Sequence, residues 1–228
     1  MKKLITAALP LAFAAAALAP APALAGSAEG KLQVKVLGTA VLADGKIVEV
    51  KNDPLGLTTG AQTDANNNVV PTLAVEYFLT PNISAETICC FTQHHVSGRG
   101  ALAPATNIVD HVLILPATLT LKYHMPLGGG IKPYVGAGPS VFFYIDEKPG
   151  SSIVPLGVTK VKMSNGVGFA LQAGVDIPIN DKGMGISLDA KKYFSDTTAR
   201  FYAGNTEVLA TKHTMDPWVL SAGLAYRF

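Results

Sequence analysis

Acidic and basic residues fall on one face of several segments in which apolar and polar side chains alternate. If that face turns into a narrow interior, carboxylates and ammonium groups meet there. They must then pair, because an unpaired buried charge is very costly. We therefore expect a network of ion pairs that plugs the interior, with an ion-selective filter as the alternative. The residues of this predicted plug are Lys35, Glu76, Glu86, Lys122, Lys132, Asp176, Asp189 and Lys191.

A second set on the same face is apolar and lies further along each segment. Apolar side chains inside a barrel would form a pocket for hydrophobic molecules above the charges. A register slip of one residue at a bulge would instead turn them outward, so that alternative stays open. The predicted pocket residues are Leu37, Val41, Ile88, Val112, Ile114, Pro116 and Phe142.

Three histidines, His94, His95 and His111, fall close to Asp110 in one region of the sequence. They lack the ligand spacing of a zinc site, and we expect them to lie at the rim of the fold. Ser97 is nearby, but a nucleophile also needs a base and a group that orients the base. We predict no enzyme activity, no metal and no cofactor.

Cys89 and Cys90 are neighbours in a segment that we expect to be a strand. Adjacent strand residues point to opposite faces, and a disulfide between them would need a distorted backbone. We expect one thiol on each face of the wall. An exported protein would reach a compartment in which disulfides form, so a disulfide between two molecules stays open.

Eight segments show the period-two alternation of strands: residues 31–42, 70–79, 83–95, 109–123, 131–145, 166–178, 185–194 and 217–228. Their connections alternate strictly between long and short. The short ones carry turn residues, as in 80–82 and 126–130. This pattern predicts an all-β fold: an eight-stranded antiparallel transmembrane β-barrel with short periplasmic turns and long extracellular loops.

The last segment runs to the final residue. Trp218, Leu220, Leu224, Tyr226 and Phe228 share one face of it. Chain ends usually fray unless a strand or helix ties them down, so this segment predicts a strand that closes the barrel. Phe228 would then lie beside Tyr226 on the lipid face at the periplasmic rim.

The N-terminus has the pattern of a secretory leader. Lys2 and Lys3 precede an apolar stretch, and a small-residue site ends at Ala25. We predict a signal peptide over 1–25, cleaved after Ala25, and one barrel domain over 26–228 in the outer membrane. Without the two lysines the formal charge falls from +2 to about zero, which gives no support for nucleic-acid binding.

Composition argues against two other classes of protein. Beyond the leader there is no apolar run long enough for a transmembrane helix. A soluble β-sandwich would need a charged outer face, and 15% charged residues is low for that.

Residues 69–86, 115–124 and 131–138 resemble the OmpW family of small outer-membrane barrels. The likeness covers most of the mature chain and departs in the loops, especially 43–68 and 146–165. The resemblance implies a narrow, mostly apolar lumen linked to the passage or binding of small hydrophobic molecules. It also implies that Tyr226 and Phe228 form a recognition signal for the barrel-assembly machinery. Some members serve as receptors for phage or bacteriocins through their loops.

From the sequence we therefore expect a barrel that binds or passes small hydrophobic solutes and releases them sideways into outer-membrane lipid. The alternative is a structural, receptor or adhesion barrel without transport.

Overall fold

The computed structural model describes residues 27, 29–54, 56 and 59–228, so the predicted signal peptide lies outside the described residues. In this part of the chain, thirteen strands join one continuous sheet. The two 3-10 turns, η1 (Gly128–Gly130) and η2 (Val154–Leu156), are short. No helix among these residues is long and apolar enough to cross a membrane.

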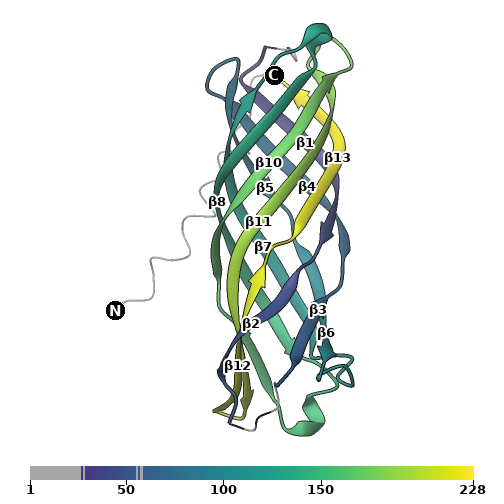
Figure 1. Ribbon diagram of the computed structural model, residues 1–228. Coiled ribbons are helices and arrows are strands. Elements are labelled where there is room, and N and C mark those ends of the chain that lie inside the picture. The colour runs from purple at the N-terminus through teal and green to yellow at the C-terminus, as the bar shows by residue number, and fades with distance from the viewer. Residues whose placement is uncertain (1–26, 28, 55, 57–58) are drawn as a thin grey trace, which may run out of the picture.

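Eight antiparallel strands close into a barrel, as predicted (Figure 1). Strands β1 and β13 pair along one side, and β10 and β11 pair on another, so the ring has no open edge. In order around the ring they are β1 (Leu32–Leu42), β4 (Asn68–Phe78), β5 (Ile83–Cys89), β7 (Val109–His124), β8 (Lys132–Pro149), β10 (Gly166–Pro178), β11 (Met184–Ala203) and β13 (Trp218–Arg227).

In its short-turn half the barrel is apolar outside and polar inside, the reverse of a soluble protein. In β7 the outward Leu119 and Leu121 are 53% and 57% exposed, whereas the inward Thr118 and Thr120 are buried. Only every second residue meets the surroundings, so the chain builds an apolar belt without any long apolar run. This arrangement suits a barrel that is surrounded by lipid.

Most of the expected long loops are in fact strands. Five further strands raise the barrel wall at one end: β2 (Gly45–Asn52), β3 (Ala61–Ala65), β6 (Thr92–Gly100), β9 (Lys160–Met163) and β12 (Thr206–Met215). Strands β8 and β11 also run beyond their predicted ends. The sequence of β3, Ala-Gln-Thr-Asp-Ala, has no apolar alternation, and its strand form depends on pairing with β6.

The other end carries short turns and both ends of the described chain, at the top of Figure 1. There the backbone N–H of Phe228 donates to the carbonyl of Leu32 at 2.8 Å, and the N–H of Leu32 donates back at 3.0 Å. The rings of Tyr226 and Phe228 lie 5.6 Å apart. The last residue is therefore tied into the wall rather than frayed.

Candidate functional site

A network of buried ion pairs crosses the interior of the barrel in its short-turn half. The Nζ of Lys122 lies 2.9 Å from carboxylate oxygens of both Glu76 and Glu86. The Nζ of Lys35 contacts the same two carboxylates at 2.8 and 3.0 Å. Lys191 joins Glu86 at 3.0 Å to Asp189 at 2.7 Å. Glu86 is thus shared by three lysines.

Neutral and aromatic side chains complete the network, and sequence reasoning missed them. Gln172 donates to Glu86 at 2.9 Å and to Asp189 at 2.6 Å. Tyr134 donates to Asp189 at 2.8 Å, and the centre of its ring lies 3.6 Å from the Nζ of Lys122. Both residues lie on the inward face of their strands, so the alternation that located the charges could also have located them.

We call this network the plug, and seven of the eight predicted charged residues take part in it. Asp176 joins through Lys35 at 3.4 Å. Lys132 does not join, which corrects the prediction for that residue. It is the first residue of β8, only half-buried at the rim, and forms no ion pair with the described residues. Since eight strands leave an interior that side chains can fill, the plug is expected to block an aqueous path.

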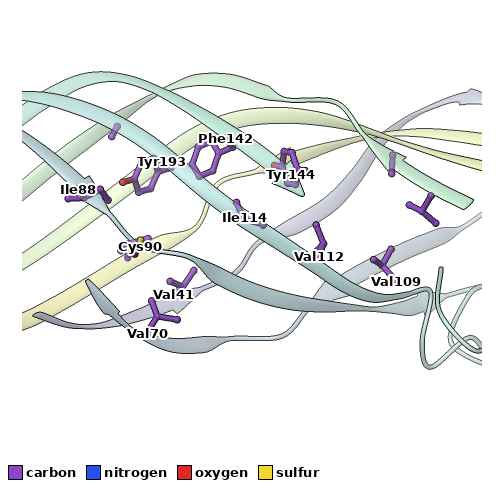
Figure 2. Close-up of a cluster of buried hydrophobic side chains, with 14 of the residues drawn as sticks. Val41, Val70, Ile88, Cys90, Val109, Val112, Ile114, Phe142, Tyr144 and Tyr193 are labelled. Atoms are coloured by element: carbon purple, nitrogen blue, oxygen red, sulfur yellow. The ribbon is translucent and has the colours of Figure 1, made fainter. Parts of the chain in front are cut away.

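Above the plug lies an apolar cavity of about 90 Å³, which we call the outer chamber. Figure 2 shows buried side chains from several strands pointing into this region. All seven residues of the predicted pocket are buried here: Val41, Ile88, Val112, Ile114, Pro116 and Phe142 line the chamber, and Leu37 packs in the same cluster. The alternation of inward and outward side chains along these strands is therefore unbroken up to the chamber.

Tyr193 lies between the chamber and the plug. Its ring meets that of Phe142 edge-on at 5.2 Å (Figure 2). Its hydroxyl lies 3.2 Å from that of Thr118. The next inward residue of β11 is Lys191, which belongs to the plug. The apolar lower end of the outer chamber is therefore directly adjacent to the plug.

Two histidines are among the polar residues that line the chamber, and each is paired with a threonine two residues earlier. The Nε2 of His94 lies 2.9 Å from the hydroxyl of Thr92, and the Nε2 of His213 lies 2.8 Å from that of Thr211. The Nδ1 of His94 donates to the carbonyl of Asn66 at 2.7 Å. The expectation that His94 lies at the rim is wrong, because it is buried in the chamber wall.

Burial makes these histidines sensitive to acid. It lowers the pKa of His94 and lowers that of His213 to about 4. For His213, the unfolded state then binds more protons than the folded state between pH 6.5 and 4, so stability falls as the pH falls through this range. For His213 the loss is on the order of 2 kcal/mol at pH 5.

Intrinsic amide exchange slows as the pH falls, so the observed rates must first be divided by the intrinsic rates. After that correction we expect the amides of β12 to exchange faster at pH 5 than at pH 7, and this excess reports the lost stability. The variant His213→Gln should lose this excess. The variant His95→Gln is the control, because His95 is exposed. An equal excess in wild type and His213→Gln would contradict the assignment.

The described residues do not bring together a metal site or a catalytic triad. His95 points outward, and its Nδ1 contacts the backbone carbonyl of Asp110, while His111 pairs with Asp146 at 3.4 Å. Donor atoms of Glu76, His124 and Asp176 lie within 4.8 Å of one another. However, the ammonium groups of Lys35 and Lys122 already occupy the Glu76 carboxylate.

Ser84, His124 and Glu76 also fail as a triad. Ser84 lies 2.8 Å and Glu76 2.9 Å from the same ring nitrogen, Nε2. A triad instead needs the acid on one nitrogen and the nucleophile on the other. The Nδ1 of His124 has no partner among the described residues.

The barrel wall is interrupted beside the chamber. Pairing between β4 and β5 stops at Leu73 and Cys89, and β6 begins only at Thr92. Pro71 has no N–H to donate in this stretch. On the outer surface here Val69 is 74% and Phe91 56% exposed. We call this interruption the wall break.

The two cysteines lie at the wall break as free thiols. Cys89 is exposed on the outer surface, and Cys90 is buried and lines the chamber. The expectation of one thiol on each face is confirmed.

Comparisons with known proteins agree with the geometry. A family model described as the OmpW family matches residues 28–228. An uncharacterized outer-membrane protein, y4mB of Sinorhizobium fredii (strain NBRC 101917 / NGR234), is 34% identical over 98% of this chain and 95% of its own length. The dibenzothiophene metabolism operon protein PahQ of Pseudomonas aeruginosa is 26% identical over 74% of this chain and 76% of its own. The crystal structure of the outer membrane protein OprG from Pseudomonas aeruginosa superposes with a TM-score of 0.76 at 22% identity, covering 89% of this chain and 98% of that one.

Proposed function

This chain belongs to the OmpW family of outer-membrane barrels, and from that premise we propose that it takes small hydrophobic molecules from outside into the outer chamber and releases them sideways into the membrane. The observation that carries the proposal is the position of an apolar chamber directly above a charged plug. A solute that reaches the chamber gains from burial but meets ammonium and carboxylate groups below. It therefore has no favourable path toward the periplasm through the lumen.

The size of the chamber limits the solutes it can hold. An engineered apolar cavity of roughly 150 Å³ stays dry and binds benzene. The chamber, at about 90 Å³, is smaller, so a one-ring aromatic or a short alkyl chain would need its walls to move apart slightly. Burial at roughly 25 cal/mol per Å² would give modest affinity that depends on size more than on chemical detail.

The wall break supports the sideways part of the proposal. It lies at the level of the exposed Val69 and Phe91, so a molecule that passes between β4 and the β5–β6 junction reaches lipid. Few backbone hydrogen bonds have to break there, because few are formed. The name of the relative PahQ refers to the metabolism of dibenzothiophene, an apolar aromatic compound, and this is consistent with small hydrophobic solutes.

We also propose that the side chains of Tyr226 and Phe228 form the signal read by the barrel-assembly machinery. The structure supports this by placing their two rings side by side at the end of the closing strand. Contact of the outer hairpins with phage or bacteriocins remains a prediction from the family resemblance. The family and fold are those of outer-membrane barrels, and we propose that the chain has no enzyme activity.

The proposal is tested by toluene titration of refolded protein in lipid nanodiscs, followed by methyl NMR. Saturable shifts are expected at Ile88 and Ile114, which line the chamber, and only linear partitioning shifts at the outward Ile186. Trp218 cannot replace this readout, because it points outward and is 48% exposed. Linear shifts at all three residues would favour a structural, receptor or adhesion barrel.

Filling the chamber should abolish the saturable shifts. Ala199 is buried in the chamber wall, and Ala199→Phe would place a ring in a space of about 90 Å³. We expect at least a tenfold weaker affinity, since a blocked cavity removes the apolar burial of the solute. The lipid-facing Ala173→Phe is the matched control and should bind normally. Unchanged affinity in Ala199→Phe would place the solute elsewhere.

A further inference from the structure

The outer part of the barrel consists of two four-stranded halves. Backbone pairing runs through β9, β11, β12 and β2 on one side, and through β3, β6, β7 and β8 on the other. Of the four outer hairpins, β6–β7 and β11–β12 pair as ordinary hairpins. The strands of the other two, β2 with β3 and β8 with β9, share no backbone hydrogen bond among the described residues. In Figure 1, β2 and β12 lie to one side and β3 and β6 to the other.

Side chains close the seam between β2 and β3. The amide of Gln62 donates to the carbonyl of Ile47 and accepts from its N–H, both at 3.2 Å. The hydroxyl of Thr63 donates to the carbonyl of Gly45 at 2.8 Å. Because that hydroxyl hydrogen is used, the Nδ1 of His213, 3.3 Å away, donates to the oxygen of Thr63. We call Gln62 and Thr63 the latch.

The opposite seam, between β8 and β9, is held by one carboxylate. Glu147 accepts from the backbone N–H of Met163 at 3.1 Å and pairs with Lys162 at 2.8 Å. Only Met163 of β9 lines the chamber, whereas β2 and β3 contribute Gly45, Ile47, Thr63 and Ala65. The chamber therefore lies directly behind the β2–β3 seam.

We propose that solutes enter the outer chamber through the β2–β3 seam, with the latch controlling how often it opens. Opening requires the loss of a few side-chain hydrogen bonds, and the exposed Gln62 can exchange its bonds with water. Opening the wall between two paired strands would instead break a series of backbone hydrogen bonds. The Thr63 hydroxyl joins β3 to both strands of the other half, through Gly45 of β2 and His213 of β12. This proposal rests on the proposed function for its solute, but the seam itself can be tested without one.

The test uses a thiol placed inside the chamber. With both native cysteines replaced by serine, Ala199→Cys provides a single buried thiol in the chamber wall. The rate of its reaction with N-ethylmaleimide then reports how often the chamber opens. Adding Gln62→Ala and Thr63→Val should raise this rate by at least about fivefold, the factor that one ordinary hydrogen bond contributes to an opening equilibrium.

Asp64→Ala is the matched control. Asp64 lies on the same strand but pairs with Arg99 within its own half, at 2.6 Å, and does not cross the seam. Its labelling rate should stay within twofold of the parent, and equal rates in the latch variant and the parent would overturn the proposal. If toluene fails to saturate the chamber while the latch variant labels faster, the proposed function fails and the seam stands. If toluene saturates the chamber but the latch substitutions leave the labelling rate unchanged, the solute enters by another route.

Discussion

Replacing Glu86 with alanine is expected to destabilise the barrel by about 3–5 kcal/mol, the range seen when one member of a buried charge network is removed. Glu86 is the carboxylate that Lys35, Lys122 and Lys191 share, at 2.9 to 3.0 Å. Without it, three ammonium groups depend on Glu76, Asp176 and Asp189 alone. The measurement is the free energy of unfolding by urea in lipid vesicles.

Glu207→Ala is the control for Glu86. Glu207 pairs with Arg200 at 2.8 Å on an outer hairpin, where solvent screens the pair and it contributes little to stability. Similar losses in the two variants would mean that the plug does not stabilise the barrel. Single-channel conductance of the Glu86 variant adds a second readout. Conductance should rise if the plug is the barrier, and an unchanged conductance would argue against that role.

A disulfide across the wall break is expected to stop passage without stopping binding. Extending the β4–β5 register by one residue sets Thr72 opposite the native Cys90. Directly opposite residues on antiparallel strands have Cβ atoms about 4.5–5.5 Å apart, so Thr72→Cys can approach disulfide geometry after a small adjustment. Oxidised cells should take up radiolabelled toluene only at the rate of cells that lack the protein. Reduction should restore uptake.

Ala74→Cys is the matched control for this disulfide, which we call the lock. Ala74 lies opposite Ile88, so the new thiol finds no partner, and oxidation should leave uptake unchanged. Toluene should still saturate the chamber of the oxidised Thr72→Cys protein, because the lock lies beside the chamber rather than in it. Full uptake by the locked protein would overturn release through the wall break.

The sequence predicted the barrel and its faces well because lipid and lumen impose opposite chemistry on alternate residues. Segment 166–178 matches β10 at both ends, and the chain reaches the closing strand where the terminal aromatic pattern predicted it. Apart from the start of β6, which falls within the predicted segment 83–95, the outer strands escaped prediction because, above the lipid, both faces of a strand accept polar residues. The alternation then disappears, as in β3, and pairing with neighbours alone makes the strand.

What the sequence determined by itself was local: which residues of each strand face inward, and hence that charges lie below and apolar residues above. Only the tertiary structure decided which of them meet. Glu86 takes its partners from 36 and 105 residues away, and His94 turned out to line the chamber because β6 continues the wall. The seam and the wall break are also tertiary features. They arise where neighbouring strands fail to pair, and a period-two pattern within one strand carries no information about the hydrogen bonds between two.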